Sequence, residues 1–161
     1  MFDFKKIPEF DKHIDLSIPN YSGLSELFQA FVGEYATSGG TVVDLGCSTG
    51  AFLSSLPKNK KVKTVGVDVI DITKFKGFDF IESTASDYLK GTLDIDVIVA
   101  MFSLQFMGRE ERKKTVNEIR RLVGNGATLL ISEKCFFGSK VENVLKRSHM
   151  NIKRNSFTDK W

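Results

Sequence analysis

The chain has 161 residues, of which 42% are hydrophobic and 27% charged, with a formal net charge of +3. This composition is typical of a folded globular protein and excludes a disordered chain or a fibrous repeat. The length predicts one domain over residues 1–161, and the absence of a long apolar run predicts a cytoplasmic protein with no membrane partner.

The first regular element that the sequence predicts is an amphipathic helix ending near Tyr35. Its apolar side chains recur at spacings of three and four, which places them on one stripe: Leu24, Leu27, Phe28, Phe31, Val32 and Tyr35. Gly39 and Gly40 end this segment. Residues 41–45 then form a short buried strand that runs into a glycine turn and a helix.

Four further strands are expected, at residues 62–68, 78–81, 95–100 and 127–131. They are continuous apolar runs, as in parallel strands covered on both faces. About ten residues join the first two of these strands, close to the minimum for a crossover, so the covering helix there should be reduced to a turn.

Two later helices complete the pattern. One lies between the last two strands, with these apolar side chains on one face: Val116, Ile119, Leu122 and Val123. The other is indicated by Val141, Val144 and Leu145. The order of elements predicts an α/β, Rossmann-like fold, in which a mostly parallel sheet of about five strands has helices on both faces. The strand pair that usually completes such a sheet at the C-terminal end is not expected.

The loop after the first strand, Asp44-Leu45-Gly46-Cys47-Ser48-Thr49-Gly50, is the main functional motif. The dinucleotide fingerprint Gly-x-Gly-x-x-Gly fits only in part, because Ser48 and Ala51 occupy two of its positions. The methyltransferase pattern acidic-x-Gly-x-Gly-x-Gly fits better, with Ser48 in the middle. The alternative is a tight strand-to-helix turn that binds nothing.

Asp68 stands at the end of the second strand, where an acidic side chain accepts hydrogen bonds from both ribose hydroxyls of a nucleotide. S-adenosylmethionine carries a sulfonium and an ammonium group and no pyrophosphate, so it tolerates an acidic neighbourhood such as Asp44 and Asp68. The sequence therefore predicts that the glycine loop and Asp68 together hold S-adenosylmethionine.

Several motifs resemble those of the carboxy-S-adenosylmethionine synthases of the tRNA wobble-uridine modification pathway, which are methyltransferase-like proteins. They are residues 17–22 (Ser-Ile-Pro-Asn-Tyr-Ser), 44–48, 102–106 (Phe-Ser-Leu-Gln-Phe) and 130–134 (Leu-Ile-Ser-Glu-Lys). The resemblance implies a class I methyltransferase fold. It also implies that the following residues line the cofactor site: Tyr21, Gly46, Cys47, Ser48, Asp68, Val69, Asp87, Tyr88 and Met101.

Met101 stands where this family has an asparagine that holds the extra carboxylate, and the chain ends before an arginine with the same role. A thioether donates no hydrogen bond to an anion, and a lost arginine contact removes roughly 1.5–3 kcal/mol. We therefore expect a class I S-adenosylmethionine-dependent transferase whose acceptor is unknown. The alternatives are a carboxy-S-adenosylmethionine synthase that uses prephenate and a non-catalytic methyltransferase-like binding module.

No catalytic residue is assigned, because the sulfonium already supplies the electrophile and the protein mainly aligns an acceptor. No metal site is expected either, since Cys47 and Cys135 are far apart and lack metal-ligand spacing.

The C-terminal tail is the basic part of the chain. From residue 146 onward it carries a charge of +4, from Lys146, Arg147, Lys153, Arg154 and Lys160 against Asp159. Such a tail predicts contact with tRNA or another RNA; the alternative is a solvated tail, which is the commoner case for basic C-terminal segments. A homodimer is expected because the sheet has an open edge and the resembling family is dimeric.

Overall fold

The computed structural model describes residues 10–58, 61–135 and 138–156. Asp159 and Lys160 of the basic tail lie outside these ranges. The described residues fall into two compact units, a larger one of Ser25–Glu133 and a smaller one from the two ends of the chain. The expectation of a single domain stays a prediction. Within the described ranges, no helix is both long and apolar enough to span a bilayer.

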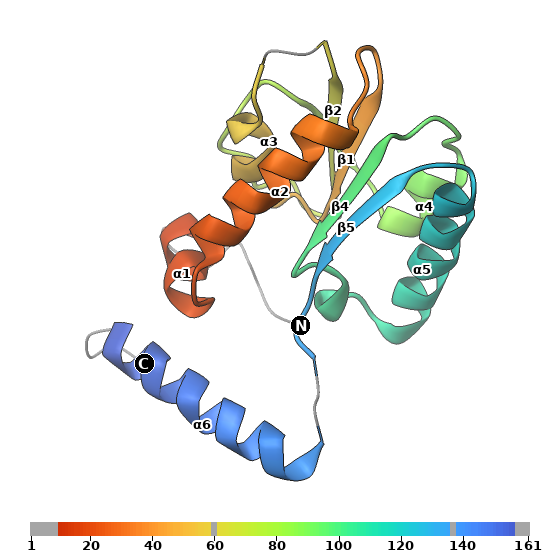
Figure 1. The fold of residues 1–161 in the computed structure, drawn as a ribbon. Helices are drawn as coiled ribbons and strands as arrows, with labels where there is room; N and C mark the ends of the chain where they lie inside the picture. The colour runs from red at the N-terminus through yellow and green to blue at the C-terminus, as the bar shows by residue number, and fades with distance from the viewer. Residues whose placement is uncertain (1–9, 59–60, 136–137, 157–161) are drawn as a thin grey trace. The chain divides into compact units, whose positions relative to one another are not determined.

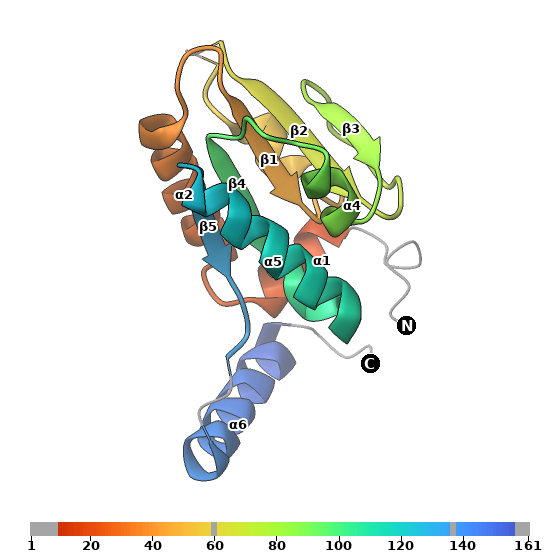
Figure 2. The same ribbon diagram turned by 90° about the vertical axis from the view of Figure 1, so that its right-hand side faces the viewer.

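The larger unit is built on one parallel sheet with the strand order β3-β2-β1-β4-β5 (Figures 1 and 2). The strands are β1 (Thr41–Leu45), β2 (Lys63–Asp68), β3 (Asp79–Glu82), β4 (Val97–Met101) and β5 (Thr128–Ser132). All neighbours pair in parallel, so the carboxyl ends of the strands share one edge of the sheet, which we call the carboxyl edge. Strands β2 and β3 lie on one side of β1. Strands β4 and β5 lie on its other side. The topological switch point, where α/β proteins bind ligands, therefore lies between β1 and β4.

Helices cover both faces of this sheet, as the sequence predicts (Figures 1 and 2). One face carries α2 (Tyr21–Tyr35) and α3 (Ala51–Ser55), and the other carries α4 (Ala85–Lys90) and α5 (Arg109–Gly124). A short 3-10 helix, η2 (Leu104–Phe106), follows β4. Residues 69–78, between β2 and β3, contain no helix, which confirms the reduced crossover.

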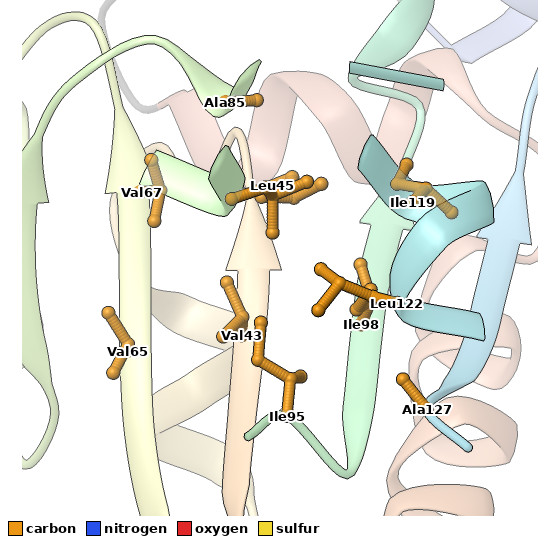
Figure 3. Packing of buried hydrophobic residues seen from close by; sticks show 11 residues of the cluster. Val43, Leu45, Val65, Val67, Ala85, Ile95, Ile98, Ile119, Leu122 and Ala127 are labelled. Atoms are coloured by element: carbon orange, nitrogen blue, oxygen red, sulfur yellow. The ribbon is translucent and has the colours of Figure 1, made fainter. Parts of the chain in front are cut away.

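The main core lies between the sheet and the α4–α5 layer (Figure 3). It is formed by side chains from the strands and these two helices: Val43, Leu45, Val65, Val67, Ala85, Leu89, Ile95, Ile98, Ile119, Leu122 and Ala127. Because side chains alternate along a strand, the residues between them on β1 and β2 face the opposite layer. This alternation places Asp44 and Asp68 on the same face of the sheet.

The predicted apolar stripe of α2 is only partly buried. Phe28 and Val32 are buried, whereas Leu27, Phe31 and Tyr35 are exposed at 39–52%. The helix therefore packs through a narrower stripe than the sequence pattern indicates.

The stripe of α5 also differs from the prediction. Ile119 and Leu122 are buried as expected, but Val116 and Val123 are exposed. The polar side chain of Thr115 is fully buried instead. The Thr115 hydroxyl donates a 3.1 Å hydrogen bond to Oε1 of Glu111, so its burial leaves no polar group unsatisfied.

The smaller unit contains α1 (Phe10–Ser17) and α6 (Ser139–Ser156), which contact each other. Helix α6 confirms the last helix that the sequence predicts. Helix α1 was not predicted from the sequence; it has eight residues, and none of them is buried.

Candidate cofactor-binding site

The glycine loop after β1 adopts the backbone that its sequence pattern predicts. Gly46, Ser48 and Gly50 have φ angles of +76°, +52° and +80°, all in the left-handed region that favours glycine. Ser48 thus takes, as a serine, the conformation for which the methyltransferase pattern has a glycine. The loop is tied to β2 by the N–H of Gly46, which donates a 2.7 Å hydrogen bond to the carbonyl oxygen of Val67.

Gly46 is also required by a close approach at the switch point. A Cβ atom at this position would lie 2.6 Å from Cβ of Ser103, in the loop that follows β4. The loops after β1 and β4 therefore touch, and any side chain at position 46 would force them apart.

Asp68 faces the glycine loop, as the sequence predicts. Its Oδ2 accepts a 3.0 Å hydrogen bond from the N–H of Ser48, and its Oδ1 accepts one of 3.3 Å from Ile70. Burial raises the pKa of this carboxyl, while the N–H groups of Ser48, Ile70 and Val69 lower it. Asp68 thus joins the end of β2 to the centre of the glycine loop.

A second carboxyl, that of Asp44, lies beneath the loop with 5% of its surface exposed. Burial raises its pKa to about 7, and the nearby charge of Asp68 contributes to the rise. Burial therefore destabilises the charged form of both Asp44 and Asp68. A cationic ligand nearby would stabilise that form.

Cys47 contributes its backbone to the loop and turns its side chain away from solvent. Its Sγ lies 2.7 Å from where a Cβ of Gly66 on β2 would be. Burial, followed by the charges of Asp44 and Asp68, raises the pKa of the thiol. The thiol therefore stays protonated at neutral pH, which makes it unsuited to act as a nucleophile.

Two buried hydroxyls lie close to the glycine loop, one within it and one against it. The Oγ atoms of Ser48 and Ser103 have no hydrogen-bond partner among the residues that the structure describes. Buried polar atoms in folded proteins are nearly always paired, and exceptions mark functional sites. These two hydroxyls are therefore candidates to contact a bound ligand.

Val69 and Met101 also lie at the carboxyl edge. Val69 directly follows Asp68 and exposes 59% of its surface. Met101 ends β4, is half-buried and pairs with Ser132 of β5.

The remaining predicted site residues are Asp87 and Tyr88 on α4, which follows the carboxyl end of β3, and Tyr21 in the smaller unit. Asp87 is exposed in the first turn of α4, where its N–H donates to Oγ1 of Thr84, the N-cap residue, and its Oδ2 accepts from the same hydroxyl. Tyr88 packs against the core, and its pKa is raised by burial, lowered by Thr92 and raised by Asp79.

Asp79 begins β3, at the opposite end from the residue that pairs with Asp68. The structure therefore does not bring Tyr88 to the glycine loop. Tyr21 begins α2 and belongs to the smaller unit, so its role stays a prediction.

Two further residues shape this site, and sequence reasoning missed one of them, Phe78. Oε1 of Glu133, directly after β5, accepts a 2.6 Å hydrogen bond from the N–H of Leu104, so Glu133 supports the loop that carries Ser103. The ring of Phe78 lies against Gly50 and Gly66, neither of which has room for a Cβ beside it. The pairing of two glycines with one later aromatic residue is visible only in three dimensions.

Curated relatives align with nearly the whole chain. The carboxy-S-adenosyl-L-methionine synthases of Pectobacterium atrosepticum and Mannheimia succiniciproducens are 28% and 29% identical to it, over 95% of this chain. The chain spans about two thirds of their length, 68% and 69% respectively.

Solved structures share the fold at lower identity. The plantazolicin methyltransferase BamL, solved with a triazolic desmethylPZN analog and SAH, matches 95% of this chain and 64% of its own at 15% identity, with a TM-score of 0.59. A TehB-like SAM-dependent methyltransferase of Corynebacterium glutamicum matches 83% of this chain and 71% of its own at 21% identity, with a TM-score of 0.53. These matches confirm the predicted Rossmann-like methyltransferase fold.

A family model covers most of the chain. The sequence model of the FtsJ-like methyltransferases matches residues 22–153, which include every strand of the sheet and the glycine loop. This match confirms the predicted class of protein, an S-adenosylmethionine-dependent enzyme of the class I methyltransferase type. The chain belongs to the FtsJ-like methyltransferase family.

Proposed function

We propose that the larger unit binds S-adenosylmethionine at the carboxyl edge, between the glycine loop and the ends of β2 and β4, and presents it to an acceptor. The observation that carries this proposal is the contact between Asp68 and the N–H of Ser48. It joins the two elements that grip a nucleotide in α/β folds, the turn after β1 and the carboxylate ending β2.

The residues at this edge fit the chemistry of that cofactor. Asp68 is placed to accept hydrogen bonds from ribose hydroxyls, and the buried Oγ atoms of Ser48 and Ser103 offer contacts to polar groups of the ligand. The raised pKa of Asp44 indicates that a positive charge nearby would be favoured there. When bound, S-adenosylmethionine supplies a methyl carbon made electrophilic by the sulfonium.

The protein's own residues then act by holding the cofactor in position for the acceptor. Gly46 lets the loops after β1 and β4 approach within contact distance, which fixes the shape of the site. Asp68 holds the middle of the loop through its hydrogen bond with the N–H of Ser48. Alignment of this kind lowers the barrier of a transfer without a dedicated acid or base.

Calorimetry with S-adenosylhomocysteine tests cofactor binding directly. Asp68→Ala should weaken binding about 10- to 100-fold, because it removes hydrogen bonds from a charged acceptor. Asp94→Asn is the matched control, since Asp94 is exposed and lies outside the proposed site.

Binding by the wild-type chain with unchanged affinity in Asp68→Ala would contradict the assignment of Asp68. Absence of binding by the wild-type chain would contradict the proposed function.

We further propose that the acceptor is an RNA. Helix α5 begins after the loop that follows β4 and carries several exposed basic side chains in its first turns: Arg109, Arg112, Lys113 and Lys114. The basic tail from residue 146, in the smaller unit, carries a second group of positive charges. Transfer of a labelled methyl group to total tRNA, with binding that weakens as salt rises, is the expected result. Transfer to small molecules with none to RNA would contradict it.

A second candidate is carboxy-S-adenosylmethionine synthesis, which the names of the relatives favour. Met101, at the end of β4, provides no hydrogen-bond donor for a carboxylate. The mass of the nucleotide that copurifies with the protein separates the two candidates. An added carboxyl group would support the synthase, and plain S-adenosylmethionine supports the methyltransferase. Binding without turnover on any acceptor would instead favour a non-catalytic module.

We also propose that two copies of the chain associate through β5 and that the protein is cytoplasmic. Among the described strands, β5 pairs only with β4, so its other edge is open. Ile131 on this strand is 47% exposed, and the strand carries neither a charge nor a proline. An open edge without such protection favours pairing with another strand.

A further inference from the structure

The loop after β4, residues 102–106, is held in an unusual conformation against the glycine loop. Phe102 has a φ angle of +53°, in the left-handed region that aromatic side chains rarely adopt. A residue stays in such a conformation only when contacts around it compensate for the strain. These contacts therefore decide where Ser103, the next residue, is placed.

The contacts come from the end of β5. The N–H of Phe102 donates a 2.7 Å hydrogen bond to the carbonyl oxygen of Ser132. The N–H of Leu104 donates one of 2.6 Å to Oε1 of Glu133. Ser132 and Glu133 thus hold the loop by hydrogen bonds to the residues on either side of Ser103. Ser132 contributes its backbone carbonyl, and Glu133 contributes its side chain.

The surroundings of Glu133 favour a charged carboxylate that can accept hydrogen bonds from this loop. Burial raises the pKa of its carboxyl, while the N–H groups of Leu104, Gln105 and Ser103 and the charge of Arg112 lower it. Three successive N–H groups and one guanidinium from α5 therefore favour the carboxylate. A charged acceptor makes a stronger hydrogen bond than a neutral one.

The position of Ser103 bears on the cofactor site. Its Cβ would lie 2.6 Å from a Cβ at Gly46, and its buried Oγ has no partner among the described residues. A small movement of this loop would therefore change both the spacing at the switch point and the direction of a free hydroxyl.

From these contacts we infer that Glu133 is a positioning residue for the cofactor site, which acts by holding Ser103 against Gly46. This inference rests on the proposed function, since the property that it affects is the affinity for the cofactor. It assigns Glu133 no contact with the cofactor or the acceptor.

The test compares variants of the full chain by calorimetry with S-adenosylhomocysteine. Glu133→Ala removes the acceptor for the Leu104 N–H and should weaken binding about tenfold or more. Glu133→Gln keeps an acceptor oxygen without the charge, so it should restore part of the affinity. A variant that unfolds is recognised by circular dichroism, and the conservative Glu133→Gln then carries the comparison.

Asp96→Asn is the matched control for a purely structural effect. Asp96 is a carboxylate of the same kind, directly before β4, and it accepts a 2.7 Å hydrogen bond from the N–H of Thr37. It lies at the opposite edge of the sheet from the glycine loop. Asp96→Asn should lower the free energy of unfolding while leaving the affinity for S-adenosylhomocysteine unchanged.

A double-mutant cycle tests the route through Ser103. If Glu133 acts by placing this hydroxyl, Glu133→Ala should cost less affinity in a Ser103→Ala background than in the wild type. Affinity within twofold of wild type in folded Glu133→Ala, or fully additive effects in the cycle, would overturn the inference and leave the proposed function standing. A wild-type chain that binds no S-adenosylhomocysteine would overturn both.

Discussion

The carboxyl of Asp44 shows how strongly the fold acts on a single residue. It is 5% exposed, and burial, with the charge of Asp68 nearby, raises its pKa from an ordinary 3.8 to about 7. Between these two values the folded protein keeps a proton that the unfolded chain releases. The free energy of unfolding therefore falls as the pH rises through this window.

Asp44→Asn should remove this dependence on pH. At pH 8 the variant should be more stable than the wild type by up to about 4 kcal/mol, because it carries no buried charge. At pH 4 the two proteins should differ little, since Asp44 is then protonated in the folded state. Urea unfolding at both pH values measures the difference.

Asp94→Asn serves as the control, because Asp94 is exposed. Its effect on stability should be small at both pH values. An equal gap between Asp44→Asn and wild type at pH 4 and pH 8 would show that Asp44 keeps an ordinary pKa.

At the scale of elements, α5 holds α4 in place by capping both of its ends. At the first turn of α4, the Glu111 carboxylate accepts hydrogen bonds of 3.0 and 2.9 Å from the N–H and hydroxyl of Ser86. At the last turn, Nη2 of Arg121 donates to the carbonyl oxygens of Leu89 and Thr92 at 2.8 and 3.1 Å. A negative charge at the start of a helix and a positive one at its end both stabilise it. Because α4 has only six residues, it depends on such contacts.

Arg121→Ala should lower the free energy of unfolding by about 1–2 kcal/mol, because two carbonyl groups at the end of α4 lose their donor. Arg120→Ala is the natural control, since the neighbouring side chain is exposed, and it should change stability by less than about 0.5 kcal/mol. Urea unfolding of both variants gives the comparison. Equal effects would mean that the cap contributes nothing.

At the scale of the whole molecule, the open edge of β5 bears on assembly. Ile131→Lys places a charge on this edge, and charged edge strands resist pairing. If two copies associate through β5, sedimentation at high concentration should show a dimer for the wild type and a monomer for this variant. Ile81→Lys is the control, because Ile81 is an exposed residue on β3, the other edge strand. A wild-type monomer, or a dimer that persists in Ile131→Lys, would contradict the proposed association.

The inner strands β1, β2 and β4 could be predicted from the sequence because parallel strands buried on both faces are mostly apolar. All five strands lie where they were expected, with bounds shifted by at most two residues. Helix faces were harder to predict, because an apolar period does not show how wide the buried stripe is. Leu27 and Val116 continue such periods but are exposed, whereas Thr115 interrupts one and is fully buried.

The site could be predicted where a local pattern determines the backbone. Gly46, Ser48 and Gly50 all adopt positive φ angles, and Asp68 faces them. Contacts between segments that are distant in the chain have no local sequence pattern and could not be predicted. Glu133 accepts its hydrogen bond from Leu104, 29 residues earlier, and Tyr88 packs against the core between the sheet and the α4–α5 layer.

The position of the Phe78 ring limits which residues can change independently of one another among related sequences. It occupies the space beside Gly50 and Gly66, next to the segment where a crossover helix is absent. A descendant that regained a helix between β2 and β3 would cover this face with new side chains and would no longer need the ring. Position 66 would still be closed to a larger residue, because Sγ of Cys47 lies 2.7 Å from where its Cβ would be. We therefore expect an aromatic residue at 78 and a short crossover to be inherited together and lost together among related chains.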